Sequence, residues 1–173
     1  MSKTKVEIGE TVEVAGEEFI VLDEFENGVL CLSKNFAYEE TAFDAKSNNY
    51  ANSKIRKKLN TEYFKKLADV IGEENILETE IDLTSDDGLD DYGKVTDKVG
   101  LLTADMYRKY NQIIEKYTVD DWWWLATPWS TPHRGTHFSV RCVDRDGTLN
   151  GHLCFRRLGV RPFCIFSTSI FES

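Results

Sequence analysis

The sequence predicts a single α+β domain over residues 1–173, because β-hairpin patterns and amphipathic helical patterns follow one another along it. Towards the C-terminus, apolar and polar residues alternate on both sides of Asp146-Gly147, which is typical of a hairpin with one buried face. Residues 6–34 alternate in the same manner around Asn27-Gly28 and predict a small antiparallel meander. Between these regions, apolar residues recur at helical spacing in residues 53–72 and 103–117.

The composition is that of a folded protein, with 41% apolar residues and a net charge of −9. The negative charge disfavours nucleic acid as a direct ligand. The sequence shows neither an apolar leader segment after Met1 nor an apolar run long enough to span a membrane, so we expect a cytoplasmic or virion-associated protein with no membrane partner. The four cysteines form no Cys-x-x-Cys pair and predict buried thiols, with two disulfides as the alternative.

Capping residues predict two short helices after a loop. Residues 36–50 have no clear period and predict an ordered loop. Asn52 or Ser53 is placed to cap a first helix, and Thr61 to cap a second helix that ends at Gly72. The basic residues of both helices predict a solvated face, with an anion-binding face as the alternative.

An acidic loop follows a predicted strand at residues 76–83. The loop SDDGLDDYG crowds four aspartates beside glycines: Asp86, Asp87, Asp90 and Asp91. This crowding fits a solvated surface loop or a Ca²⁺ site built of oxygen ligands, although the spacing is not that of the twelve-residue EF-hand loop. Residues 99–102 predict a short buried strand, and Thr103 is placed to cap the helix that follows it.

All four tryptophans fall within residues 122–129, where they either anchor a core or line a binding surface. Trp123 and Trp124 are consecutive in a predicted strand, so they point to opposite faces and are expected to be structural. Trp129 follows a proline in a polar loop and is expected to be exposed. Arg161, at the start of a predicted strand, is expected to act as a structural clamp that donates hydrogen bonds to carbonyls or a carboxylate.

Cationic residues surround Trp129 and predict a site that stacks a ring and pairs an anion. The candidate binding residues are Trp129, His133, Arg134, His137, Arg145, Arg156 and Arg157. In residues 132–161, six arginines stand against two aspartates, which gives this stretch a charge of +4 and leaves −13 for the rest. The expected partner is a host protein or an anionic small molecule. The alternative is that the arginines only cover the solvent face of a hairpin.

Four segments resemble a family of bacterial and phage domains of unknown function. They are YANSKIRKKLN (residues 50–60), TDKVGLLT (96–103), WWLATP (123–128) and GVRPFCIF (159–166). The resemblance implies a C-type-lectin-like fold, in which a twisted antiparallel sheet near the C-terminus, with two or three helices, holds a loop-rich ligand-binding face. Folds of that kind include formylglycine-generating-type enzymes and the variable proteins of diversity-generating retroelements.

The family pattern falls on individual residues of all but one of these segments. They are Ser53, Ile55, Arg56, Leu59 and Asn60 in the first, Trp123, Trp124 and Leu125 in the third, and Gly159, Val160, Arg161 and Pro162 in the fourth. Two positions depart from the pattern. Tyr50 stands where the family has tryptophan, and Ala126 stands where it has arginine, so a role that depends on that arginine is in doubt here.

Catalysis and metal binding find little support in the sequence. His133 and His137 are four residues apart, but the proline and glycine near them disfavour a helix that would present both to a metal. Cys154 and Cys164 are the possible counterparts of the reactive cysteine pair that formylglycine-generating-type enzymes use, yet both lie in strand patterns typical of buried thiols. We therefore expect no catalytic residue, no metal and no cofactor.

Three functions follow as hypotheses. The first is a non-catalytic binding module whose C-terminal loops, residues 129–136, 144–150 and 151–158, contact a partner. In a phage, it would be a counter-defence protein that binds a host protein or a nucleotide signal. The second is an acidic DNA-mimicking inhibitor that presents residues 82–97 to a nucleic-acid-binding protein. The third is a formylglycine-generating-type oxidoreductase that depends on its cysteines.

Overall fold

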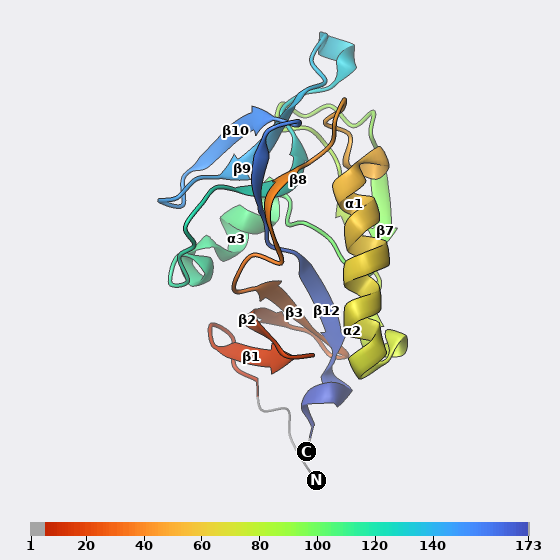
Figure 1. Ribbon diagram of the computed structural model, residues 1–173, viewed down its shortest axis with the longest axis vertical. Helices are drawn as coiled ribbons and strands as arrows, with labels where there is room; N and C mark the ends of the chain where they lie inside the picture. Colours follow the sequence, from red (N-terminus) through yellow and green to blue (C-terminus); the bar gives the residue numbers. More distant parts are fainter. Residues whose placement is uncertain (1–5, 173) are drawn as a thin grey trace.

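The computed structural model describes residues 6–172 and shows an α+β fold with two five-stranded sheets (Figure 1). The sheet drawn lower has the order β1-β2-β3-β12-β5: Thr11–Val14, Glu17–Glu24, Gly28–Ser33, Phe163–Ser167 and Ile76–Leu77. The upper sheet has the order β10-β9-β8-β11-β4: Leu149–Leu153, Ser139–Val143, Trp123–Pro128, Arg157–Val160 and Tyr38–Ala42. A separate antiparallel pair is formed by β6 (Thr79–Asp82) and β7 (Lys94–Asp97). The upper sheet is mixed, because β11 runs parallel to β8.

The two predicted hairpin regions are confirmed. Strands β1, β2 and β3 form the antiparallel meander, and the first of its turns lies at Ala15 and Gly16, which both have positive φ (54° and 79°). Strands β9 and β10 form the C-terminal hairpin around the turn at residues 144–147. The expectation of one buried face is wrong for β9, whose residues 140–143 are all buried. Trp129 covers Arg141 on one side of this strand, and core residues cover the other side.

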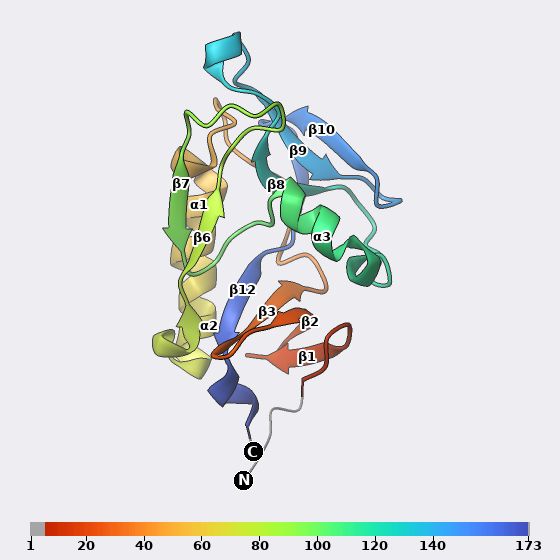
Figure 2. The same cartoon turned by 180° about the vertical axis from the view of Figure 1, so that it is seen from behind.

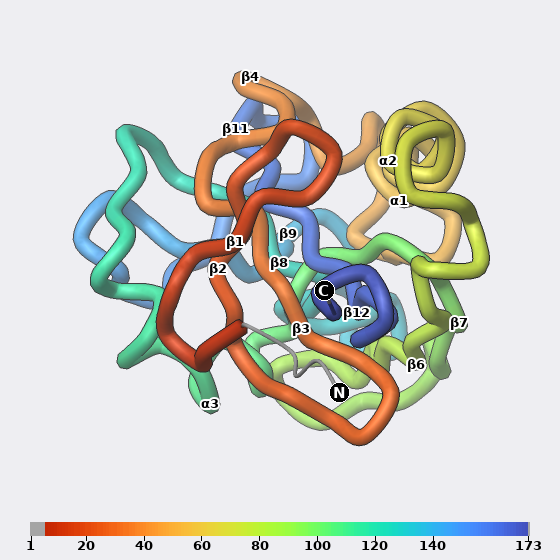
Figure 3. Tube along the Cα trace, turned by 90° about the horizontal axis from the view of Figure 1, so that it is seen from below, coloured from red at the N-terminus to blue at the C-terminus, as the bar shows by residue number. Residues whose placement is uncertain are grey.

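One continuous helix stands where two were predicted. It consists of α1 (Lys54–Lys58), a π-helical turn (Leu59–Tyr63) and α2 (Phe64–Ile71), which share one axis when seen from below (Figure 3). Ser53 caps it as expected by accepting a hydrogen bond from Arg56 N, and Gly72 ends it with a φ of 89°. The predicted cap at Thr61 is wrong. This residue lies inside the π turn, where its hydroxyl donates to the carbonyl of Lys57 (2.7 Å).

Three other predicted elements differ in the structure. Residues 38–42, predicted as loop, form the edge strand β4, which alternation did not reveal because Glu39 and Glu40 leave it without an apolar stripe. The predicted strand at residues 76–83 is divided at Glu78, so that β5 and β6 belong to different sheets. Residues 99–102 are buried, but they form only a single bridge, between Gly100 and Phe163.

The second helix, α3 (Ala104–Ile114), begins where it was predicted, with Thr103 accepting a hydrogen bond from Met106 N. The continuous helix of residues 54–71 and α3 lie on opposite sides of the two sheets (Figure 1 and Figure 2). Among residues 6–172, none of the helices has the length and apolar character needed to cross a membrane.

Arg161 lies where the chain passes from the upper sheet to the lower one, between β11 and β12. Its side chain is 1% exposed, and Nε donates to the carbonyl of Ser33 (3.1 Å) while Nη2 donates to those of Lys34 (2.9 Å) and Tyr117 (3.4 Å). Burial lowers the pKa of this guanidinium to about 10, and the group stacks on Trp123 at 4.8 Å. Ser33 and Lys34 begin another such crossing, from β3 to β4, so Arg161 holds these two crossings together.

Two of the segments that carry the resemblance bind each other. Arg56 donates from Nε and Nη2 to the carboxylate of Asp97 (2.9 and 2.7 Å), which is almost fully buried. The side chain of Asn60 donates to the carbonyl of Val99 (2.9 Å) and accepts a hydrogen bond from its N–H (3.1 Å). These contacts fix the long helix against residues 97–99, so the residues of both segments hold the scaffold together.

Gly159, one of the residues that match the family pattern, occupies a position with no room for a side chain. A Cβ atom on Gly159 would lie 2.4 Å from the ring of Phe36, which packs against the backbone of β11. We expect Gly159→Ala to lower the free energy of unfolding by about 1–3 kcal/mol, because the ring would have to move away from the backbone of β11, against which it packs. Urea unfolding of Gly159→Ala, Phe36→Ala and the double variant would measure this. If the double variant loses at least as much free energy of unfolding as the two single variants lose together, the clash is not the cause.

Candidate functional site

Trp129 follows β8 and lies flat on the sheet, with one face of its ring covered. The Arg141 guanidinium carbon is 4.8 Å from the ring centroid, and a Cβ atom on Gly151 would lie 3.4 Å from the ring. The backbone N–H of Trp129 donates to the carbonyl of Ser139 (2.9 Å). The residue is nevertheless 47% exposed, so the other face of the ring is available to a ligand.

The loop of residues 129–138 is held by Asn48, which lies in the segment predicted to be an ordered loop. Asn48 is fully buried, and its amide donates to the carbonyls of Ser130 (2.8 Å) and Ser139 (2.9 Å). Its side-chain oxygen accepts a hydrogen bond from the hydroxyl of Tyr92 (2.6 Å). Because these bonds join both ends of the loop, they hold Trp129 in place. Nothing local in the sequence marked Asn48 for this role.

The acidic loop, residues 85–91, holds the same segment from its other side. Asp87 accepts hydrogen bonds from the hydroxyls of Ser85 and Ser130, and these two bonds lower the pKa of its carboxyl group. The same carboxylate lies 3.6 Å from Arg134 Nε. Asp91 accepts a hydrogen bond from Thr131 (2.8 Å). The predicted acidic and basic surfaces are therefore neighbours that bind each other.

A metal site at the acidic loop has no support in this geometry. Asp86 lies 3.2 Å from Arg108 and 3.8 Å from Arg141, so its carboxylate faces guanidinium groups, and Asp87 and Asp91 face hydroxyls. Among residues 6–172 there is no group of three or more His, Cys, Asp or Glu side chains arranged to hold a metal ion.

Arg141 is a further residue of this region that the sequence did not single out. It is only 9% exposed, and its guanidinium makes no hydrogen bond to any residue from 6 to 172. Its contacts are the ring of Trp129 above it and the more distant ion pair with Asp86. The positive charge beneath the Trp129 ring holds it in position through a cation–π contact.

Two more exposed aromatic residues lie at the same end of the hairpin. Phe138 is 42% exposed and Phe155 is 48% exposed, although both stand at apolar positions of the hairpin alternation, which predicts a buried face. Cys154 N donates to the carbonyl of Phe138 (2.7 Å), which places Phe155 beside the end of β9. The ring of His137 lies 4.0 Å from that of Phe138. Exposed aromatic side chains gathered in this way are typical of an interaction surface.

Most of the predicted cationic residues belong to this end, and all but one of these are exposed. We call it the loop-end surface, and it consists of Trp129, His133, Arg134, His137, Phe138, Phe155, Arg156 and Arg157. His137 is the half-buried one. Arg156 and Arg157 form no ion pair with any described residue, and Arg134 has only its long contact with Asp87. Residues 151–158, which were predicted to form a contact loop, lie partly in β10 and β11.

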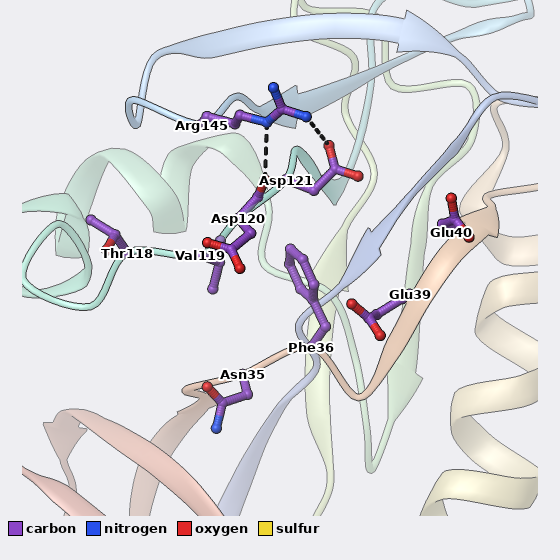
Figure 4. A pocket seen from close by; sticks show the side chains of 9 residues that line it. All are labelled: Asn35, Phe36, Glu39, Glu40, Thr118, Val119, Asp120, Asp121 and Arg145. Atoms are coloured by element: carbon purple, nitrogen blue, oxygen red, sulfur yellow. Dashed lines mark hydrogen bonds and ion pairs between the residues drawn. The ribbon is translucent and has the colours of Figure 1, made fainter.

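Arg145 is the predicted residue that the structure places elsewhere. It lies at the turn of the β9–β10 hairpin, where Nε donates to the carbonyl of Asp120 (2.9 Å) and Nη2 lies 3.7 Å from Asp121. These residues line a cavity of about 520 Å³ around Phe36, with Glu39 and Glu40 on its other side (Figure 4). The cavity is lined by four carboxylates and one guanidinium, and it contains no residue of the loop-end surface.

His152 of β10 gives this region a pH dependence. Burial and the nearby charge of Arg156 lower its pKa, so the unfolded chain binds this proton more readily than the folded chain. The free energy of unfolding should therefore fall as pH drops through the ordinary histidine range of about 6.5. We expect the decrease between about pH 8 and about pH 5 to be smaller in His152→Gln than in the wild type, as measured by urea unfolding. The exposed His133, changed to Gln, is the control. Equal decreases in wild type and His152→Gln would contradict the assignment.

The cysteines are buried thiols, as predicted. All four are free and buried, and burial raises the pKa of Cys142 to about 12. Cys164 lies opposite Cys31 in the lower sheet, whereas Cys154 follows β10 in the upper sheet. The pKa values of Cys154 and Cys164 are also raised by burial, which makes both thiols poor nucleophiles. This arrangement does not favour chemistry by a Cys154–Cys164 pair.

Trp123 and Trp124 lie on different partners, as expected for consecutive strand residues. Trp123 packs edge to face on Tyr107 of α3, with ring centroids 5.7 Å apart, and Trp124 packs on Phe43 at 5.6 Å. The indole N–H of Trp124 donates to the carbonyl of Thr41 (2.8 Å), which ties β8 to β4. Both rings are buried, so neither is available to a partner.

A family model described as a domain of unknown function (DUF6273) matches residues 26–168. This range includes every strand except β1 and β2, and it includes the whole loop-end surface. No curated protein and no solved structure matches the chain.

Proposed function

We propose that this chain, which belongs to the DUF6273 family of domains of unknown function, is a non-catalytic binding module whose loop-end surface contacts an acidic partner protein. The observation that carries the proposal is the position of Trp129. One face of its ring is supported by Arg141 and Gly151, and the residue is 47% exposed. A supported aromatic ring that remains open to solvent loses little conformational entropy when it binds, which is typical of a binding hot spot.

Charge complementarity favours an acidic partner. The protein as a whole has a charge of −9, yet Arg156 and Arg157 stand exposed at the loop end without ion-pair partners among residues 6–172. Arginine beside aromatic residues is the composition that protein interfaces prefer, and its guanidinium can donate two parallel hydrogen bonds to a carboxylate. A partner that presents aspartate or glutamate would be attracted to this end of an otherwise acidic molecule.

A protein partner fits better than a small anion. Small molecules bind in concave pockets that enclose most of their surface. The cavity of about 520 Å³ lies around Phe36 and is acidic, so it does not suit an anionic signal. At the loop end, three aromatic residues and several cations instead stand on loops and strand ends, which suits a broad contact with another protein.

In this proposal the fold is C-type-lectin-like, with a sheet that supports a variable, loop-rich binding face. The upper sheet and the loop of residues 129–138 correspond to those parts, and Asn48 and the acidic loop hold the loop rigidly. For a phage-encoded member, the partner would be a host defence protein, which the module would block by occupying its surface. The DNA-mimicking alternative has less support, because Asp86, Asp87 and Asp91 bind groups of this chain.

Substitution of the loop-end residues tests this function. We expect Trp129→Ala and Arg134→Ala each to weaken partner binding at least about 30-fold, as hot-spot residues do, and to change the melting temperature little. The partner would be recovered on immobilised protein from the native cell, identified by mass spectrometry, and its affinity then measured by calorimetry.

Matched controls separate binding from folding. Phe25→Ala removes an aromatic side chain that is 48% exposed but lies in the lower sheet's β2–β3 turn, and Lys65→Ala removes an exposed cation of α2. Both should leave affinity unchanged. If Trp129→Ala and Arg134→Ala bind the partner as the wild type does, the loop-end surface is not the site. A large fall in melting temperature would show that the two residues are structural.

A further inference from the structure

The strand β10 (Leu149–Leu153) is an edge of the upper sheet and is paired on one side only, with β9. It is the outermost strand of its sheet in both side views (Figure 1 and Figure 2). The bonds from Asp144 N to Thr148 O and from Cys154 N to Phe138 O show that the even-numbered residues of this strand face β9. The N–H and C=O groups of Leu149, Gly151 and Leu153 therefore point away from the sheet.

Most of these outward groups have no partner among residues 6–172. The N–H of Gly151 is covered only by the side chain of its neighbour Asn150 (2.9 Å), and the carbonyl of Leu153 accepts a hydrogen bond from Arg156 N (3.0 Å). No hydrogen bond is made by either backbone group of Leu149, by the carbonyl of Gly151 or by the N–H of Leu153 within the described chain. A row of unpaired backbone groups of this kind is a template for another strand.

The other edge strands of the described chain carry charges that protect them, and β10 does not. Glu13 lies in β1, Glu39 and Glu40 lie in β4, and the β6–β7 pair contains four charged residues, while β5 has only two residues. The sequence of β10, LNGHL, contains no Asp, Glu, Lys or Arg. Charged side chains on an edge are a common means of preventing strand addition, so their absence leaves β10 open to it.

The sequence of β10 is complementary to itself. If two copies pair antiparallel about a twofold axis at Gly151, Leu149 of each copy lies opposite Leu153 of the other, and Asn150 lies opposite His152. Apolar residues thus meet apolar residues on one face, and polar residues meet polar residues on the other. At the centre, the two Gly151 residues face each other without side chains to separate the strands.

The charges beside β10 are complementary under the same axis. Asp146 lies five residues before Gly151 and Arg156 lies five residues after it, so Asp146 of one copy comes opposite Arg156 of the other. Arg157 lies in β11, which is not adjacent to β10 in the sheet, and takes no part in this contact. Arg145 does not oppose this, because it is bound to Asp120 and Asp121 of its own chain. Arg156 is exposed and forms no ion pair with any residue from 6 to 172, so it is available for such a contact.

From these observations we infer that the chain forms a twofold dimer in which β10 pairs antiparallel with β10 of a second copy. Each outward-facing residue exchanges two backbone hydrogen bonds with its counterpart, and the two upper sheets become one sheet of ten strands, five from each copy. Opposite residues of antiparallel strands lie on the same face, so both Trp129 rings lie on one face of this sheet, next to the axis. The dimer and the proposed partner share Arg156, whereas the pairing of Leu149 with Leu153 belongs to the dimer alone.

Sedimentation equilibrium of the full chain tests this pairing. The expected mass at high protein concentration is twice 19.9 kDa, and it should return to 19.9 kDa on dilution. Leu153→Lys should reduce the association constant at least about tenfold, because it places a charge opposite Leu149 of the second copy. Val70→Lys is the matched control, since Val70 is an exposed aliphatic residue of α2. It should leave the association constant unchanged.

A charge exchange makes the test specific for the register. Arg156→Glu should weaken the dimer, and Asp146→Lys together with Arg156→Glu should restore it, because the pair is reversed across the axis. In hydrogen exchange, the amides of Leu149 and Leu153 should be slow in the dimer and fast in Leu153→Lys. Arg156 is exposed, so its variant keeps the test decisive if Leu153→Lys fails to fold.

Two results would overturn the inference. One is a mass of 19.9 kDa at every concentration. The other is a dimer whose association is unchanged by both Leu153→Lys and Arg156→Glu, which would place the contact elsewhere. The inference and the proposed function are separated if Trp129→Ala loses the partner but keeps its mass, or if it keeps the partner but changes its mass. If the chain is monomeric and Leu153→Lys weakens the partner, a strand of the partner occupies β10 instead.

Discussion

Asn48→Asp is expected to lower the free energy of unfolding by about 3–5 kcal/mol, although it replaces only an amide group by a carboxylate. The buried amide of Asn48 donates to the carbonyls of Ser130 and Ser139, and a carboxylate would turn an acceptor towards both of them. Two carbonyls would lose their donor, and an unpaired charge would be buried between them. Urea unfolding would measure the loss, and quenching of tryptophan fluorescence would show whether the Trp129 loop becomes more mobile.

The adjacent residue supplies a control with the same chemical change. Asn49 uses its side-chain oxygen to accept a hydrogen bond from Ala51 N (3.0 Å), so aspartate can replace it without losing the bond. We expect Asn49→Asp to be close to neutral. If the two variants lose equal stability, the effect is due to negative charge in this segment, and the role assigned to the Asn48 amide is wrong.

Arg161→Met is expected to lower the free energy of unfolding by about 2–4 kcal/mol. Methionine can fill much of the space beside Trp123, but it cannot donate to the carbonyls of Ser33 and Lys34. Those carbonyls lie where the chain passes from one sheet to the other, so losing the hydrogen bonds to them loosens the contact between the two sheets. Thermal and urea unfolding of the same variant would give the value.

Arg161→Lys separates the shape of the side chain from its charge. A lysine keeps the charge but cannot stack flat on Trp123 or supply the planar set of guanidinium donors. We therefore expect this variant also to be less stable than the wild type. Arg157→Lys is the control, because Arg157 is exposed and should tolerate the change within about 0.5 kcal/mol. Wild-type stability in Arg161→Lys would mean that charge alone is required at this position.

The elements that the sequence predicted well are those fixed by neighbouring residues. Alternation and turn residues located the meander and the β9–β10 hairpin, and Ser53, Gly72 and Thr103 marked helix ends correctly. In each case the hydrogen bond that defines the turn or the helix end joins residues only a few positions apart in the sequence. The signal therefore lies within a short window of sequence.

The elements that the sequence missed depend on residues far along the chain. The strand β4 has no apolar stripe, and it is a strand because β11, more than a hundred residues later, pairs with it. Thr61 has the chemistry of a cap, but the helix continues through it because Leu59 and Tyr63 are both buried against the core. Local propensity was overridden by packing in both places.

The candidate site could be located from the sequence but not assembled. Trp129 was expected to be exposed and is, because the proline before it and the polar residues after it are local signals. Arg145 was grouped with it, yet the turn carries it to Asp120 and Asp121. Asn48 and Arg141 were missed, since their partners are brought to them only by the fold. The family resemblance fell on residues such as Arg56 and Gly159, which build the scaffold.

The π-helical turn at Leu59–Tyr63 makes the long helix one residue longer than its two ends require. If residues 59–63 formed an ordinary α-helical turn instead, the extra residue would rotate residues 64–71 by about 100° about the axis. Leu67, now buried, would then swing towards solvent, and Lys65 or Lys66 would turn towards the sheets. The wider turn absorbs the extra residue and keeps the apolar side of α2 on the core, so removing one residue there should leave an uninterrupted helix with the same side buried.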